Sequence, residues 1–232
     1  MPESVPVDIF ASKGAEYLLV IFFLGALVLY LRFLLRPAPS RAVPAPAAQP
    51  AGLQDRWFHV PEEMYYHPGH SWVQPNGGEE VTIGISDFAQ KLIGRPDGVR
   101  FPEVGTQLEH GVPGLVLKVG EESIELLSPV DGEVIAVNQA VLDDPELVNR
   151  DPYGTGWLVK VKTSRWSPNQ KCLLRDRMAN AWMEITERVL RQEMAGKLGT
   201  VLQDGGFPVT GIARSISDEE WSSLVKEFFL TE

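Results

Sequence analysis

The side chains of this chain that are best placed to take part in a reaction are three acids grouped in one short segment. Glu121, Glu122 and Glu125 lie within five positions of one another, between two apolar runs. Neighbouring carboxylates can carry out acid–base catalysis when burial or charge shifts their pKa values. A polar segment between two apolar runs is expected to be an exposed turn, where such shifts are small. We therefore interpret the cluster as a solvated acidic tip that discourages pairing between strand edges.

The remaining reactive side chains do not form a recognisable site. The sequence has one cysteine, Cys172, which excludes an internal disulfide framework and a cysteine-rich metal site. The four histidines do not have the spacing of metal ligands. The chain contains no Gly-x-Ser-x-Gly, His-Glu-x-x-His or Walker-type segment. We expect neither a catalytic residue nor a metal site, and hence a protein that is not an enzyme.

The acidic segment lies inside residues 114–137, around which the rest of the chain is organised. Short alternating apolar runs, broken by Gly, Pro and Asp, predict strands joined by tight turns. The first tip falls at residues 120–122, and the second turn falls at residues 129–132. Gly132 can adopt a positive φ in that second turn.

The flanking sequence, from residue 56 to residue 165, is also dense in strand signals. Residues 81–85 predict a strand, and residues 86–93 predict a short helix that begins after Ser86 as its N-cap. Residues 157–161 predict a further strand. The expected order is mainly β, with short helices at the periphery.

Several of these segments resemble one family. Residues 128–134 read SPVDGEV, which is similar to S-P-V-x-G-E-V in the glycine cleavage H protein of the lipoyl-carrier superfamily. Other segments are similar to that family in the same order along the chain: HSWV at 70–73, IGISDFAQ at 83–90, PEVG at 102–105, and PELVNRDPYG with GW at 145–157. The resemblance implies a flattened barrel-sandwich, mainly β, over residues 56–165.

The same resemblance identifies a missing residue. In the family the hairpin tip reads roughly E-S-V-K-A, and its lysine carries lipoate seven residues before the segment similar to SPVDGEV. Counting back seven positions from Ser128 gives Glu121. The nearest lysine, Lys118, falls three positions earlier, in the predicted strand. The resemblance therefore implies a carrier fold without its cofactor, and the alternative is a lipoyl arm on Lys118.

The N-terminal part of the chain predicts a membrane anchor. Residues 17–35 are apolar apart from Arg32, and at about 1.5 Å per residue a helix of this length nearly crosses a hydrocarbon core of about 30 Å. A cleaved signal peptide is the competing interpretation, but the preceding residues are not basic. Arg32, Arg36 and Arg41 outnumber Lys13 across this segment, which predicts a cytoplasmic C-terminal side.

The predicted organisation therefore has five parts. They are a short N-terminal segment (1–16), a transmembrane helix (17–36), a Pro/Ala-rich linker (37–55), the β domain (56–165) and a helical C-terminal extension (166–232). The predicted location is a bacterial-type inner membrane, crossed once.

The C-terminal extension carries two apolar helical faces. Met178, Trp182, Ile185 and Val189 recur at helical spacing and predict a buried face, with Glu184 and Arg188 paired on the other side. A capping box at Ser217 and Glu220 predicts a terminal helix. Its apolar side chains form the expected partner-binding surface, with packing on its own domain as the alternative: Trp221, Leu224, Val225, Phe228 and Phe229.

The composition limits the function further. A net charge of -10 and a pI near 5.0 exclude a basic nucleic-acid interface. We expect a non-catalytic, membrane-anchored accessory or scaffolding subunit of an energy-conversion complex, either respiratory or photosynthetic. Its expected partners are the lipid bilayer and other subunits of that complex, and no cofactor is expected unless Lys118 carries lipoate.

Overall fold

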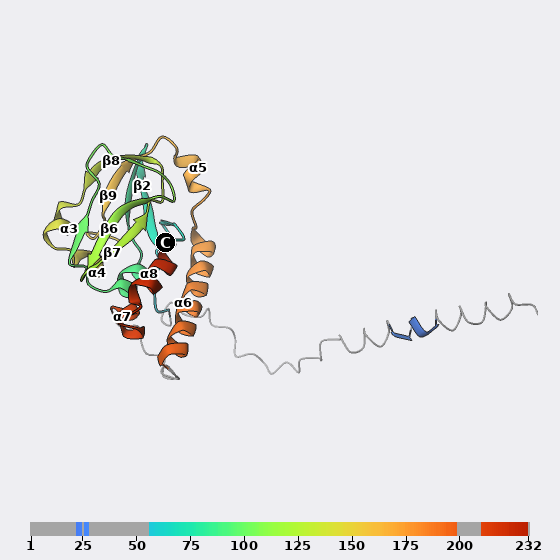
Figure 1. Ribbon diagram of the computed structural model, residues 1–232. Helices are drawn as coiled ribbons and strands as arrows, with labels where there is room; N and C mark the ends of the chain where they lie inside the picture. Colours follow the sequence, from blue (N-terminus) through green and yellow to red (C-terminus); the bar gives the residue numbers. More distant parts are fainter. Residues whose placement is uncertain (1–21, 25, 28–55, 199–209, 232) are drawn as a thin grey trace, which may run out of the picture. The chain divides into compact units, whose positions relative to one another are not determined.

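A computed structural model describes residues 22–24, 26–27, 56–198 and 210–231 of the protein (Figure 1). The chain divides into two units, Met1–Gln54 and Asp55–Glu232. In the first unit, residues 22–24 and 26–27 are helical. The rest of the predicted transmembrane segment, 17–36, lies outside the described residues. Among the residues described, no helix has both the length and the apolar character needed to cross a membrane.

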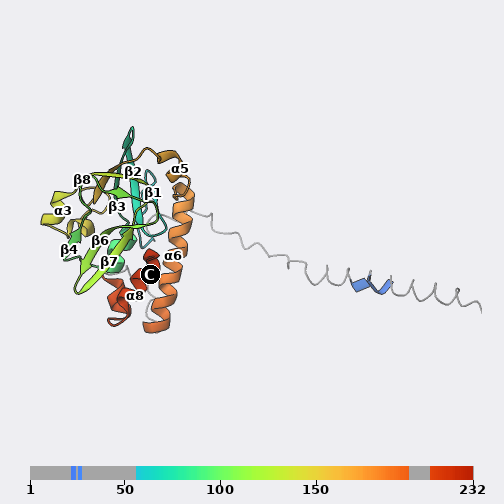
Figure 2. The same cartoon turned by 45° about the horizontal axis from the view of Figure 1, so that its top comes forward.

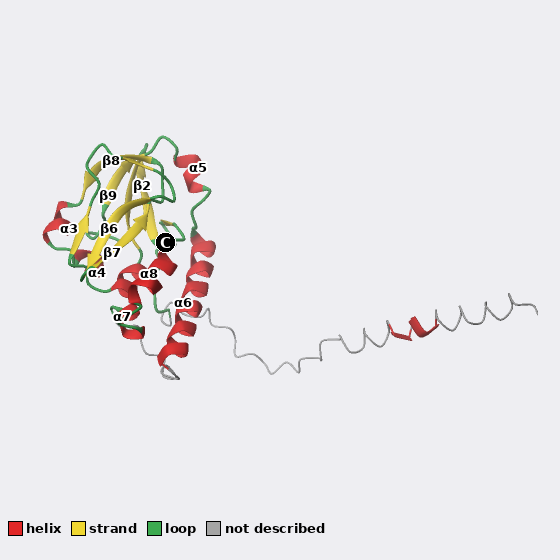
Figure 3. Ribbon diagram, in the orientation of Figure 1, coloured by secondary structure: helices red, strands yellow, loops and turns green. Residues whose placement is uncertain are grey.

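Two antiparallel sheets form the centre of the second unit (Figure 3). The larger sheet has the strand order β1-β2-β3-β9-β8-β5, and the smaller has the order β4-β6-β7. The strands are β1 (Tyr65–Tyr66), β2 (Ser71–Gly77), β3 (Glu80–Ile85), β4 (Gly98–Arg100), β5 (Gln107–Leu108), β6 (Pro113–Val119), β7 (Glu122–Leu127), β8 (Gly132–Val137) and β9 (Val159–Lys162). The predicted β domain with a helical C-terminal extension is confirmed.

Helices surround the sheets at the periphery (Figure 3). They are α2 (Asp87–Ile93), α3 (Gln139–Asp143), α4 (Leu147–Arg150), α5 (Trp166–Gln170), α6 (Asp176–Leu198), α7 (Ile212–Ile216) and α8 (Trp221–Phe229). The long helix α6 runs along one side of the domain, next to the C-terminal helices α7 and α8, in both Figure 1 and Figure 2.

The strand β3 and the N-terminal cap of α2 form where the sequence predicts them. The strand β3 ends at Ile85, and Ser86 then takes an extended conformation, with φ -71° and ψ 161°. Its hydroxyl accepts a hydrogen bond from the backbone N–H of Ala89 at 3.2 Å, which satisfies one of the free donors at the start of α2. This cap fixes the point at which the chain changes from sheet to helix.

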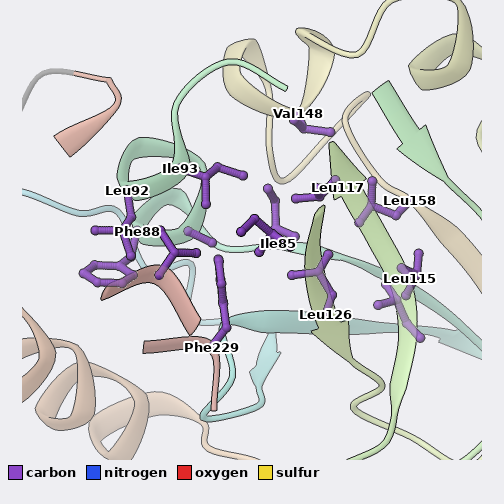
Figure 4. Close-up of a cluster of buried hydrophobic side chains, with 14 of the residues drawn as sticks. Ile85, Phe88, Leu92, Ile93, Leu115, Leu117, Leu126, Val148, Leu158 and Phe229 are labelled. Atoms are coloured by element: carbon purple, nitrogen blue, oxygen red, sulfur yellow. The ribbon is translucent and has the colours of Figure 1, made fainter. Parts of the chain in front are cut away.

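A single apolar core receives side chains from sheets and helices alike (Figure 4). Leu117 of β6 and Leu126 of β7 point into it, together with Ile85 of β3 and Phe88 of α2. Phe229, near the end of the chain, enters the same cluster and is fully buried. The C-terminal extension is thus part of the core of the β domain.

The composition of this core contradicts the expected role of the terminal helix as a partner-binding surface. Trp221, Leu224, Val225 and Phe229 are buried in the domain's own core, and Phe228 packs partly buried against it. The ring centroid of Phe228 lies 5.2 Å from that of Phe88. These side chains are therefore not a free surface for a partner, and own-domain packing is what the structure adopts. The physical reason is that α8 lies along β7, which has no further strand beyond it in the smaller sheet.

The predicted buried face of α6 was also wrong. Met178 and Ile185 are exposed, and Val189 is exposed to 38 %. The helix instead buries the neighbouring row, which contains Ala179, Met183, Thr186 and Leu190. Both rows have helical spacing, so spacing alone could not tell them apart. The predicted pair between Glu184 and Arg188 is likewise replaced, because Glu184 binds Arg56 at 2.7 Å.

Removing the buried ring of Phe229 tests this packing. We expect Phe229→Ala to lower the free energy of unfolding by about 3–5 kcal/mol, because the ring leaves a cavity in a closed core. Leu230 is the matched control, since it is the next residue and is 57 % exposed. Leu230→Ala should change stability by less than about 0.5 kcal/mol. Urea unfolding measures both variants, and equal small effects would show that α8 is not anchored in the core.

Candidate functional site

The hairpin of β6 and β7 contains the residues that the sequence singled out. Lys118 pairs with Ser123 and Val119 pairs with Glu122, so Gly120 and Glu121 alone form the loop. Gly120 has φ +64°, whereas Glu121 is not among the positive-φ residues. A positive φ at the first loop residue only is the pattern of a type II′ turn, which favours glycine at that position. The predicted tip is confirmed, one residue shorter than expected.

The structure places the two candidate positions for an arm in different settings. Glu121 is exposed at the tip itself. Lys118 is also exposed, but it lies within β6, where it pairs with Gly98 of β4 on one side and Ser123 of β7 on the other. Its amine therefore projects from the surface of the smaller sheet. The tip offers a carboxylate and no amine, so it does not fit a lipoyl amide.

The tip is held by groups from two other parts of the chain. A carboxylate oxygen of Asp97 accepts a hydrogen bond from the backbone N–H of Gly120 at 2.5 Å. Nη2 of Arg214, in α7, donates to the carbonyl oxygen of Val119 at 3.3 Å. The guanidinium of Arg214 also lies over the ring of Trp221, 4.5 Å from its centroid. We call Asp97, Arg214 and Trp221 the tip clamp.

The clamp occupies the space that a larger side chain at position 120 would need. A Cβ added to Gly120 would lie 2.8 Å from Nη2 of Arg214. Helix α7 is in turn fixed to α2, because the backbone N–H of Gly211 donates to the carbonyl of Lys91 at 2.7 Å. The tip thus combines a glycine-dependent turn with a cation packed directly against it.

Sequence reasoning missed the clamp for a simple reason. Arg214 lies 95 positions from the carbonyl that it binds, and no local pattern links two such distant positions. The only available signal was Gly120 itself. Glycine as the first residue of a two-residue loop favours a type II′ turn.

A second polar cluster lies beside the turn at residues 129–132. It lines a hollow of about 400 Å³ that includes His110, Asp131 and Arg165. Asp131 accepts hydrogen bonds from the backbone of His110 at 2.9 Å and from Asn169 at 3.0 Å, and it pairs with Arg165 at 3.2 Å. These contacts, led by the His110 N–H, hold the pKa of Asp131 below its usual range. Its carboxylate is therefore occupied in shaping the turn.

The histidines behave as structural side chains. His70 is buried between Phe88 and Trp182, with ring centroids 4.2 Å and 4.6 Å away. Burial lowers the pKa of His70 to about 3 and that of His67 to about 4, so both are neutral at pH 7. Within the described part of the chain, no group of three or more His, Cys, Asp or Glu residues is placed to hold a metal ion.

Comparison with known proteins assigns the domain that contains the β6–β7 hairpin to a family. The model for the glycine cleavage H-protein matches residues 64–185, which is more than half of the chain. The chain belongs to the glycine cleavage H-protein family. It is 42 % identical over 106 residues to the glycine cleavage system H protein of Photorhabdus laumondii, covering 46 % of this chain and 82 % of that protein. The H protein of Aeromonas hydrophila is 40 % identical over 104 residues, covering 45 % and 81 %.

A solved structure is also similar to this chain. The crystal structure of the H protein from Mycobacterium marinum is 27 % identical, with a TM-score of 0.48, and it covers 55 % of this chain and 99 % of that one. Members of the H-protein family are carrier proteins and not enzymes.

The residues of the tip clamp come from both inside and outside the family match. The hairpin and Asp97 lie inside the matched residues 64–185, whereas Arg214 and Trp221 lie beyond them. Arg214, outside the H-protein match, therefore contacts the hairpin at Val119 and Gly120, next to Glu121, where the resemblance expects the carrier lysine. Figure 2 shows the hairpin beside the red C-terminal helices.

Two substitutions at the tip test its geometry. We expect Gly120→Val to lower the free energy of unfolding by about 1–2 kcal/mol, because a β-branched residue resists a positive φ. The neighbouring change Glu121→Lys should alter it by less than about 0.5 kcal/mol, because Glu121 is exposed. Thermal and urea unfolding compare the two. A tolerated Gly120→Val would show that the turn does not need glycine.

Proposed function

We propose that this H-protein family member is a non-catalytic, membrane-anchored accessory or scaffolding subunit that has lost the lipoyl site of its fold. Respiratory or photosynthetic energy-conversion complexes are the membrane assemblies that we propose as its setting. The observation that carries the proposal is the hairpin tip, where Gly120 and Glu121 stand in a type II′ turn and no amine is available.

The tip clamp supports this loss. A lipoyl arm is attached to the amine of an exposed lysine at the tip. Here Asp97 binds the backbone N–H of Gly120, and Arg214 donates to the carbonyl of the preceding residue, Val119. These contacts fix the backbone of the tip, and its exposed side chain is the carboxylate of Glu121, which cannot form a lipoyl amide.

The alternative function is a lipoyl carrier modified at Lys118. Its exposure favours this alternative, since an enzyme could reach its amine. Its position opposes it, because Lys118 lies inside the three-stranded sheet with paired backbone on both sides. A lipoyl arm on Lys118 would extend from the face of the sheet and not from the tip of a hairpin.

Intact-mass measurement separates the two functions. We expect the full-length protein, made in a host that lipoylates its own H protein, to have its unmodified mass, because the tip has no lysine. The host H protein, recovered from the same cells, is the positive control for lipoylation. A gain of one lipoyl group that disappears in Lys118→Ala would establish the carrier function instead.

The proposed anchor also has a topology that can be tested without engineering the chain. Cys172 is the one cysteine in the sequence and is exposed. With the domain in the cytoplasm, as the arginines after residue 31 predict, a membrane-impermeant maleimide should label Cys172 in lysed cells and leave it unlabelled in intact spheroplasts. Equal labelling in both preparations would reverse the orientation.

A further inference from the structure

Helix α6 carries an apolar stripe that its own domain leaves uncovered. Met178 is 62 % exposed, Ile185 is 55 % exposed and Val189 is 38 % exposed. Trp182 lies in the same row and is half-buried. We call these four residues the α6 stripe. They are spaced by four, three and four positions, so they form one continuous line along the helix.

The first described residues of the folded domain bind this same helix. Nη1 of Arg56 donates to Oδ1 of Asn180 at 2.5 Å, and Nη2 binds Oε1 of Glu184 at 2.7 Å. The next residue, Trp57, is buried, and its ring lies 4.0 Å from the guanidinium carbon of Arg191. The first described residues of the folded domain, Arg56 and Trp57, therefore lie against α6.

Two exposed arginines of α6 lie near the stripe. Arg177 and Arg188 are both exposed, and neither takes part in an ion pair within the described part of the chain. Three of the four acids of α6 are paired with arginines, since Asp176 binds Arg175, Glu184 binds Arg56 and Glu187 binds Arg191. An apolar row with a tryptophan and unpaired arginines is the composition of a helix that lies at a lipid surface.

We propose that the α6 stripe rests on the anionic headgroup surface of the membrane that residues 17–35 anchor. This inference depends on the anchor in the proposed function and adds an orientation to it. The apolar side chains of Met178, Ile185 and Val189 enter the boundary between headgroups and acyl chains. Arg177 and Arg188 bind lipid phosphates beside them.

Because the linker ties the domain to the proposed anchor, a weak contact between α6 and the membrane is sufficient to hold this face there. At about 3.1 Å per residue, a Pro/Ala-rich linker over residues 37–55 has a maximum reach of roughly 60 Å. The domain is therefore held at a high effective concentration near the bilayer, where even a modest affinity leaves the surface occupied.

A spin label on α6 tests the contact in the full-length protein. The label is placed at Ala181→Cys, an exposed position next to Trp182, in a Cys172→Ser background. A label at Ser123→Cys, on the exposed side of β7, is the matched control. The protein is reconstituted into vesicles of equal parts phosphatidylcholine and phosphatidylglycerol. We expect a water-soluble nickel chelate to reach position 181 several-fold less than position 123.

The arginines and the lipid charge have their own controls. We expect the protection at 181 to disappear in Arg177→Glu/Arg188→Glu and in vesicles of phosphatidylcholine alone. Arg100 is an exposed arginine of β4, and Arg100→Glu should leave the protection intact. Protection that survives both the double reversal and the neutral vesicles would overturn the role of anionic headgroups.

Flotation of the same vesicles distinguishes failure of the anchor from failure of this inference. A full-length protein that does not float with vesicles refutes the proposed anchor, and the α6 contact with it. A protein that floats while position 181 stays as accessible as position 123 refutes only the α6 contact. Protection that appears in native membranes but not in these vesicles would show that a protein covers the stripe, which also overturns a lipid contact.

Discussion

The packing of one hairpin into one apolar core is the constraint on which the rest of this structure depends. Leu115 and Leu117 of β6 and Leu126 of β7 fill the core from one side. Phe229 of the terminal helix closes it from another (Figure 4). Because interiors pack at nearly crystalline density, an element that shares this core cannot move without disturbing the others. The H-protein hairpin and the C-terminal extension therefore behave as one body.

That shared core also determines which groups lie against the hairpin tip. Once α8 packs along β7, the adjoining helix α7 brings Arg214 to the base of the tip. Glycine at position 120 leaves room for the guanidinium, and Asp97 completes the hydrogen bonding of the turn. Function belongs to sites and not to folds, so the H-protein fold by itself does not give this chain the activity of a carrier.

The same extension also creates new surface. By burying Ala179, Met183 and Leu190, α6 turns the adjacent apolar row outward, on the helix that also binds Arg56. The hairpin tip and the α6 stripe are therefore separate features, because the tip clamp holds the first and the second is left uncovered.

The sequence by itself determined the features that depend on neighbours in the chain. The strand β3, the Ser86 cap, the hairpin with its tip at Gly120 and Glu121, and the absence of a lysine there all follow from local pattern and resemblance. Only the tertiary structure decided which of two helical rows on α6 is buried, and whether the apolar face of α8 meets its own domain. Periodicity reports that a face is apolar, but its partner is set by contacts between distant segments, as with Arg214 and Val119, which are 95 positions apart.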